Sequence, residues 1–338
     1  MYFSASRKIL TPVLFALFFA ASAFAEGGEP GAFTKIGAGV RAAGMGSAYT
    51  AAADDTSAVI YNPAGLVLLP DLQLSAETYL MAFNRAVNFI SIGKPFDIHD
   101  NVYSVGLSWF NYSAGGDIEV RATDSYEPDS LMSDSANIFI FTAGTTLAKN
   151  LFIGGNFRYY LETTGKARGT GVGFDLGALL KINKWLKAGI SASNISTNIT
   201  WNNSTMVEGI PLNAAAGLCA MALEPFDVKG LGLTGSADIL YYGFGFFRAR
   251  AGAELTWHDF ASLRAGFDGA SFSAGAGIKL KPSEIFTVSI NYAFKPDNIL
   301  PGEANHRIGL TADYIFPHYS GVEDETKKTK GDNEKSEW

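Results

Sequence analysis

Apolar and polar residues alternate along the chain between residues 72 and 316. In one segment Phe286, Val288 and Ile290 are apolar, whereas Thr287 and Ser289 between them are polar. Because successive side chains of a strand point to opposite faces of a sheet, each such segment predicts a strand with one apolar and one polar face. Fourteen segments are predicted, at 72–82, 85–93, 101–112, 137–147, 150–163, 168–182, 185–195, 210–223, 231–242, 246–257, 259–268, 270–281, 284–295 and 305–316.

A soluble exported β protein would show the same alternation, but three features favour a membrane barrel. The segments are about ten residues long, which is the length that a tilted strand needs to cross the hydrocarbon layer, whereas soluble strands average about five or six. Their polar faces carry glycine, serine, asparagine and charges of both signs, as a lumen does. Aromatic residues lie near the segment ends, as in the girdles of outer-membrane barrels: Trp109, Trp185, Tyr241, Tyr242, Trp257, Tyr292 and Phe316.

The lengths of the connections alternate as well. Connections after even-numbered segments are mostly tight, as at 149–150 and 183–184, whereas those after odd-numbered segments include the long stretches 113–136 and 196–209. Outer-membrane barrels have short turns on one rim and longer loops on the other, and bacterial single-chain barrels have an even number of strands. We therefore predict an all-β fold, a transmembrane antiparallel β-barrel of about 14 strands.

The first 25 residues have the pattern of a secretory signal peptide. Arg7 and Lys8 precede an apolar run at 9–20, and Ala-Phe-Ala at 23–25 is a small-x-small cleavage site. No later run has the roughly 18 apolar residues of a spanning helix, and closed barrels are the other structure that satisfies every backbone group in lipid. We expect a barrel in the bacterial outer membrane with both termini periplasmic.

The segment 26–70 differs from the strands that follow it. It is rich in glycine and alanine, it lacks alternation, and it contains a predicted helix at 56–61 that Asn62-Pro63 ends. A barrel of 14 strands is too wide for its own side chains to fill. We therefore expect 26–70 to be a plug, or hatch, in the lumen of a barrel formed by 71–316, followed by a polar, disordered periplasmic tail at 317–338.

Three motifs in the hatch resemble a known family. Residues 39–46 (GVRAAGMG), 53–55 (ADD) and 61–66 (YNPAGL) are similar to the N-terminal signature of the FadL-type superfamily, with the PorV/PorQ-like branch nearest, and 306–310 (HRIGL) is also similar to that branch. The resemblance implies a 14-stranded outer-membrane barrel with a hatch that carries an Asn-Pro-Ala element. It also implies a set of hatch and gating residues: Gly44, Met45, Gly46, Asp54, Asp55, Asn62, Pro63 and Ala64.

The same resemblance implies two alternative functions. FadL-type members take up hydrophobic molecules, chiefly long-chain fatty acids, by passive diffusion through hatch movement and a lateral opening in the wall. PorV-like members serve the type IX secretion system as docking proteins. The partners implied are outer-membrane lipid together with either a fatty acid-like ligand or secretion-system proteins. The outer loops of this chain are shorter than those of the transporters.

Composition excludes several other classes. With 26 basic and 33 acidic residues, the net charge is −7, which argues against binding to nucleic acid through its phosphates. A single cysteine cannot form an intramolecular disulfide. The four histidines have no metal-ligand spacing, and the glycine pairs 37/39 and 44/46 lack the spacing of a dinucleotide-binding loop. We expect no enzymatic activity, no metal and no cofactor.

Charged residues also fall on the polar faces of neighbouring predicted strands. We expect these side chains to face the lumen: Arg248, Arg250, Glu254, Arg264 and Asp268. One interpretation is a salt-bridged wall that holds the hatch. The other is that the arginines meet the carboxylate of a ligand during transit.

Overall fold

In the computed structural model, described residues begin at Pro30 and end at Phe316. They are 30–99, 101–115, 118–121, 124, 126–205, 207–223, 228–243, 245–297 and 303–316. The predicted signal peptide and the predicted tail lie outside them. Among the residues that the structure describes, no helix has the length and apolar character needed to cross a membrane.

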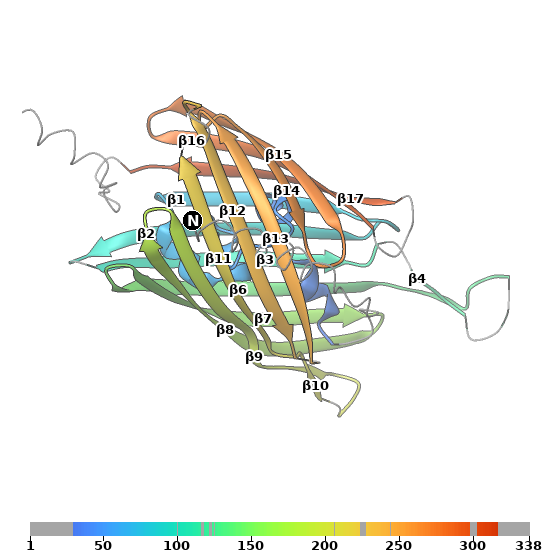
Figure 1. Cartoon of the computed structure of the whole chain (residues 1–338). Coiled ribbons are helices and arrows are strands. Elements are labelled where there is room, and N and C mark those ends of the chain that lie inside the picture. The colour runs from blue at the N-terminus through green and yellow to red at the C-terminus, as the bar shows by residue number, and fades with distance from the viewer. Residues whose placement is uncertain are drawn as a thin grey trace, which may run out of the picture.

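Fourteen antiparallel strands pair in sequence and close into one barrel, because β1 pairs with both β2 and β17 (Figure 1). Each strand corresponds to one predicted segment, so the predicted fold class is confirmed. The strands are β1 (Leu72–Leu80), β2 (Ala86–Ile98), β3 (Asn101–Ser113), β6 (Asp134–Ala148), β7 (Leu151–Thr164), β8 (Ala167–Asn183), β9 (Leu186–Trp201), β11 (Asn213–Leu223), β12 (Leu231–Tyr242), β13 (Phe246–Trp257), β14 (Ala261–Phe267), β15 (Phe272–Ser283), β16 (Phe286–Pro296) and β17 (Ala304–Tyr314).

Two of the long connections contain further short strands. In the first, β4 (Ile118–Val120) pairs with β5 (Ser130–Met132) to form a ribbon that projects beyond the barrel (Figure 1). In the second, β10 (Val207–Gly209) pairs with the end of β9, which continues to Trp201 where a loop was predicted. The barrel therefore has a long-loop end, which carries both features, and a short-turn end.

The alternation separates the outer and inner faces of the wall. On the outer face, large apolar side chains such as Leu107, Ile190 and Leu263 are each more than 60% exposed, which suits contact with lipid. Tyr241 and Tyr242 were both expected in an aromatic girdle, and this expectation was wrong for Tyr242. Adjacent residues of a strand point to opposite faces, so Tyr242 lies buried on the inner face of β12.

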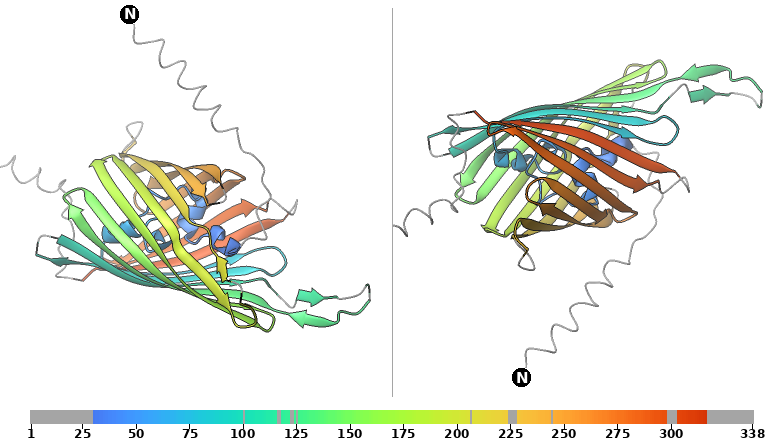
Figure 2. Two further views of the ribbon diagram at one scale, coloured as in Figure 1. Left: turned by 90° about the horizontal axis from the view of Figure 1, so that it is seen from below. Right: turned by 90° about the horizontal axis from the view of Figure 1, so that it is seen from above.

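The hatch lies inside the barrel, where both views in Figure 2 show its short helices surrounded by strands. The helix predicted at 56–61 is shorter and begins at Ala58, with the backbone N–H of Ser57 bonded to Asp55. It ends at Tyr61, before the Asn-Pro pair, as predicted. The hatch helices are η1 (Ala32–Ile36), α2 (Val40–Gly44), α3 (Ala58–Tyr61) and η2 (Pro63–Leu68).

The hatch chain runs through the lumen from one end to the other. At the long-loop end, the ring of Phe33 in η1 stacks on Tyr112, near the end of β3. At the short-turn end, η2 packs on β6, β7 and β8, and β1 begins soon after it. The described chain ends with Phe316 at this same short-turn end, where its N–H donates to the carboxylate of Asp71. Both chain termini lie outside the described residues, so their periplasmic location stays a prediction.

Candidate functional site

Glycines on the inner face of the wall let the hatch backbone approach closely. A Cβ on Gly252 or Gly266 would collide with the backbone of Met45, and one on Gly154 would collide with Pro63. A Cβ on Gly189 would likewise collide with the backbone of Thr50 in the hatch. Only glycine has no Cβ, so at these wall positions only glycine leaves room for the hatch backbone. We call these positions the seats of the hatch.

Wall side chains also bind the hatch backbone directly. Glu77 of β1 accepts hydrogen bonds from the N–H groups of Gly39 and Val40, at 2.8 and 3.1 Å. On the opposite part of the wall, Asp238 of β12 accepts from the N–H of Thr50 at 2.8 Å. The first two bonds satisfy N–H groups at the start of α2, which have no partner within the helix, and the third satisfies one between the hatch helices.

Asn62 of the Asn-Pro-Ala element joins the hatch to β8. Its Nδ2 donates to the carbonyl oxygens of Thr50 and Ala178, at 2.9 and 3.0 Å, and its Oδ1 accepts from the N–H of Ala64 at the start of η2. Pro63 occupies the first helical position, where no N–H is needed. The predicted hatch residues Asn62, Pro63 and Ala64 are all buried.

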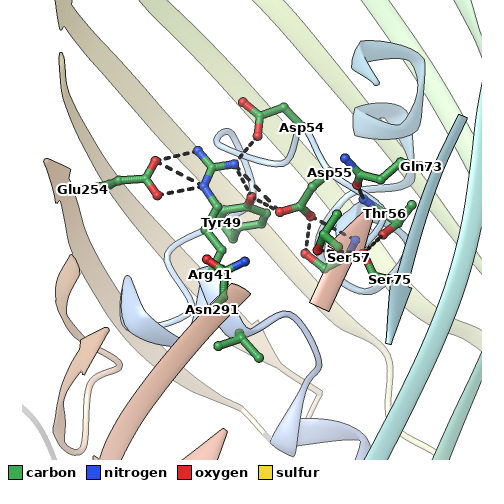
Figure 3. A network of polar contacts seen from close by, with 12 residues as sticks. Arg41, Tyr49, Asp54, Asp55, Thr56, Ser57, Gln73, Ser75, Glu254 and Asn291 are labelled. Atoms are coloured by element: carbon green, nitrogen blue, oxygen red, sulfur yellow. Dashed lines mark hydrogen bonds and ion pairs between the residues drawn. The ribbon is translucent and has the colours of Figure 1, made fainter. Parts of the chain in front are cut away.

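A chain of charged side chains crosses the lumen through Arg41 (Figure 3). The guanidinium of Arg41 donates to Glu254 of β13, at 2.7 Å from Nη2, and also to Asp54. Glu254 in turn accepts from Arg264 of β14, and Asp54 lies 3.4 Å from the ammonium of Lys187 of β9. We call these five residues, which link β9 to β14 through the hatch, the Arg41 network.

Two further hatch residues support the network. The hydroxyl of Tyr49 accepts from Arg41 and donates to the carboxylate of Asp55, each at 2.7 Å. Asp55 also accepts from the N–H of Ser57 at the start of α3. The predicted hatch residues Asp54 and Asp55 therefore bind the same guanidinium region from two sides (Figure 3).

Asp54 is ionised throughout the physiological pH range. Burial alone would raise the pKa of this carboxyl group, but the charges of Arg41 and Lys187 hold the pKa at about 2. A folded-state pKa below the unfolded value of about 3.9 contributes stability above that value, and the contribution is lost as pH falls toward 2.

This pKa gives a prediction about acid stability. The difference in melting temperature between the wild type and Asp54→Asn is expected to stay constant from pH 8 to about pH 4 and to shrink below it. Thermal unfolding of the purified barrel in detergent measures this difference at each pH. A difference that stays constant down to pH 2, or that grows as pH falls, would show that the pKa of Asp54 is not lowered.

The lumen-facing candidates separate into two groups. Glu254 and Arg264 lie directly opposite each other on β13 and β14 and belong to the Arg41 network. Arg248, Arg250 and Asp268 lie nearer the long-loop end. Arg250 donates to the hydroxyl of Tyr242 at 2.9 Å, Arg248 lies 5.8 Å from the centre of the same ring, and Asp268 pairs with Lys295.

The remaining predicted hatch residues pack against the wall. Met45 is fully buried, the N–H of Gly46 donates to the hydroxyl of Ser273 at 3.1 Å, and Gly44 lies against Gly275. Residue patterns did not identify Lys187 or Glu77, although both occupy polar positions in predicted strands. Arg41 stands within the quoted hatch motif, but nothing in the local sequence indicates its partner Glu254, 213 positions away.

The lumen near the long-loop end has an apolar side and a cationic side. The apolar side is a buried cluster that includes Phe89, Phe110 and Ile138, with Phe33 of the hatch packed on it. On the cationic side, the guanidinium of Arg307 lies 4.2 Å from the centre of the Tyr79 ring. Among the described residues, Nε of Arg250 and both Nε and Nη1 of Arg307 are buried without a hydrogen-bond partner.

Two polar cavities adjoin the hatch. The long-loop cavity, of about 80 Å³, is lined by Lys35, Ser47, Tyr61, Tyr242 and Arg250, among others. The short-turn cavity, of about 300 Å³, is lined by four members of the Arg41 network, Arg41, Asp54, Glu254 and Arg264, together with residues near the rim such as Asp259 and Asp313. Within the described ranges, no group of histidine, cysteine or acidic side chains has the arrangement of a metal site.

Comparisons with known proteins identify the fold. No family model and no curated protein matches the chain. Among solved structures, the CymD monoaromatic hydrocarbon channel matches with a TM-score of 0.56 and 13% identity, over 84% of this chain and 99% of that one. The Ralstonia pickettii toluene transporter TbuX matches with a TM-score of 0.56 and 10% identity, over 83% and 99%.

A third solved structure links the fold to the resemblance in the hatch motifs. A Pseudomonas aeruginosa FadL homologue matches with a TM-score of 0.50 and 12% identity, over 81% of this chain and 98% of that one. At such low identity the likeness shows the fold alone. None of these three structures is a PorV- or PorQ-like protein by its title.

Proposed function

We propose that this chain, which has the fold of the FadL-type outer-membrane barrels, takes up hydrophobic small molecules across the bacterial outer membrane under the control of its hatch. The structures with the same fold are titled as a hydrocarbon channel, a toluene transporter and a FadL homologue. The apolar outer face suits a membrane protein, and the apolar cluster in the lumen suits an apolar ligand. The transport needs no cofactor, because the ligand moves down its own gradient.

The two-sided lumen near the long-loop end supports a long-chain fatty acid as the ligand rather than a neutral hydrocarbon. Buried N–H groups of an arginine cost free energy when they lack an acceptor. A carboxylate would supply that acceptor to Arg250 and Arg307, while its alkyl chain would lie on the apolar cluster around Phe110. The observation that carries the proposal is that buried arginine N–H groups without an acceptor lie near an apolar surface.

A binding experiment tests the ligand class. Arg307→Gln is expected to weaken binding of a long-chain fatty acid by about tenfold, because a hydrogen bond to a charged group contributes about 1.5–3 kcal/mol. Binding of the methyl ester of the same acid is expected to stay unchanged. Calorimetry on the purified barrel in detergent measures both ligands.

The matched control is Arg121→Gln, which removes an arginine from the exposed β4–β5 ribbon. It is expected to bind both ligands as the wild type does. If Arg307→Gln weakened binding of the acid and the ester equally, or of neither, the carboxylate would not be recognised at Arg307.

The alternative function, protein docking in a secretion system, predicts a partner rather than a lipid ligand. No contact among the described residues favours it specifically, since the same barrel and hatch would serve both functions. A stable protein partner co-purified with a barrel that binds no fatty acid would favour docking.

A further inference from the structure

The two polar cavities lie on either side of one part of the hatch. The long-loop cavity reaches Tyr61 and Ser47 of the hatch and Arg250 of the wall. The short-turn cavity reaches Arg41 and Asp55 of the hatch and extends to the rim. Each cavity therefore places a cation of its own, Arg250 or Arg41, beside the hatch. The short-turn cavity is also lined by six carboxylates, two of which, Glu254 and Asp54, already bind Arg41.

Two tyrosines connect the cavities. The ring of Tyr61, which lines the long-loop cavity, packs edge-on against the ring of Tyr49 at 5.5 Å between centroids. The hydroxyl of Tyr49 in turn binds Arg41 and Asp55, which line the short-turn cavity. The only direct hydrogen bond from the Tyr61 hydroxyl among the described contacts is a long one, 3.4 Å to Ser47.

Other parts of the hatch meet the wall through backbone. Met45 lies on Gly252 and Gly266, and Thr50 lies on Gly189, with no side chain between the two backbones. Rotation of a side chain cannot open such a contact. At the tyrosine pair, by contrast, side chains rather than two backbones connect the residues that line the two cavities.

We infer that the path of solute through this barrel runs from the long-loop cavity to the short-turn cavity, and that Tyr61, packed on Tyr49, is the side chain that closes it. The inference rests on the proposed uptake function. The exit then leads along the lumen toward the short-turn rim, where the short-turn cavity ends.

Ion conductance in planar bilayers tests this path without any ligand. Tyr61→Ala is expected to show discrete openings that the wild type lacks, with a conductance below that of a variant in which residues 30–70 are deleted. Tyr61→Phe keeps the ring and is expected to stay closed. Tyr160→Ala is the matched control, because Tyr160 is a fully buried lumen tyrosine in the apolar cluster, away from the partition.

A reporter cysteine locates the current. Ser289 lines the short-turn cavity, and replacing the native Cys219 with alanine removes the other thiol. In the Tyr61→Ala background, a charged thiol reagent is expected to block openings when Ser289→Cys is present and not when it is absent. Failure of the reagent to block would place the current elsewhere and overturn the inference.

Three other outcomes would also contradict it. They are a closed Tyr61→Ala barrel, a Tyr160→Ala barrel that conducts as well as Tyr61→Ala, and a Tyr61→Ala conductance equal to that of the hatch deletion, which would mean that the hatch had left. Heat-modifiable gel mobility confirms that each barrel is folded. If the openings and the block appear but the wild type takes up no fatty acid, the path stands and the proposed function fails.

Discussion

Replacing Arg41 with methionine is expected to loosen the hatch and convert a closed barrel into one that conducts ions. Arg41 is the member of the network that joins Glu254 of the wall to Asp54 of the hatch. Its loss leaves the buried carboxylate of Glu254 and the partly exposed carboxylate of Asp54, each with one remaining cation. Breaking a buried ion pair from one side costs about 3–5 kcal/mol, so we expect a clear loss of thermal stability together with new conductance.

Planar-bilayer recordings and thermal unfolding in detergent measure these two effects. Arg121→Met is the matched control, because Arg121 pairs with Glu119 on the exposed ribbon, where an ion pair contributes about 0–1 kcal/mol. A variant Arg41→Met that stays closed and melts with the wild type would show that the network does not hold the hatch.

Gly252→Val is expected to displace the hatch from its seat. The added Cβ would collide with the backbone of Met45, and neither side can retreat easily, because β13 is paired on both sides and the hatch is bound across the lumen. Overpacking of a closely packed site costs about 1–3 kcal/mol, and more where backbone must move. The hatch should become cleavable by added protease.

The chain offers a close control for this substitution. Gly235 lies on the outer face of the neighbouring strand β12, and a Cβ added there meets nothing within 4 Å. Gly235→Val is therefore expected to leave the hatch resistant to protease and the barrel closed. If both valine variants behaved alike, the inward glycines would not be seats for the hatch.

The strands were predictable because their signal is local. Alternation fixes which residues face lipid, and the length of each segment indicates a membrane span. The need to fill a wide lumen predicts a plug without knowledge of any contact. The main errors in the strands are local as well. Tyr242 was placed in an outer girdle beside Tyr241, although adjacent residues of a strand cannot both face outward.

The contacts that define the site were not predictable, because they join distant parts of the chain. Glu254 and Arg264 were expected to pair across neighbouring strands, and they do. Their link to Arg41 depends on how the hatch lies in the lumen, which no local pattern encodes. The wall glycines are similar: alternation places Gly252 on the inner face, but only the position of the hatch shows that Met45 lies against it.

Uptake of a labelled long-chain fatty acid by a host that lacks its own importer tests the central claim most directly. The barrel would be expressed with its hatch, and heat-modifiable gel mobility would confirm that it has folded. We predict uptake above the empty-vector level, with a marked reduction in Arg307→Gln. A folded wild-type barrel that gives only the empty-vector level would contradict uptake as the function of this protein.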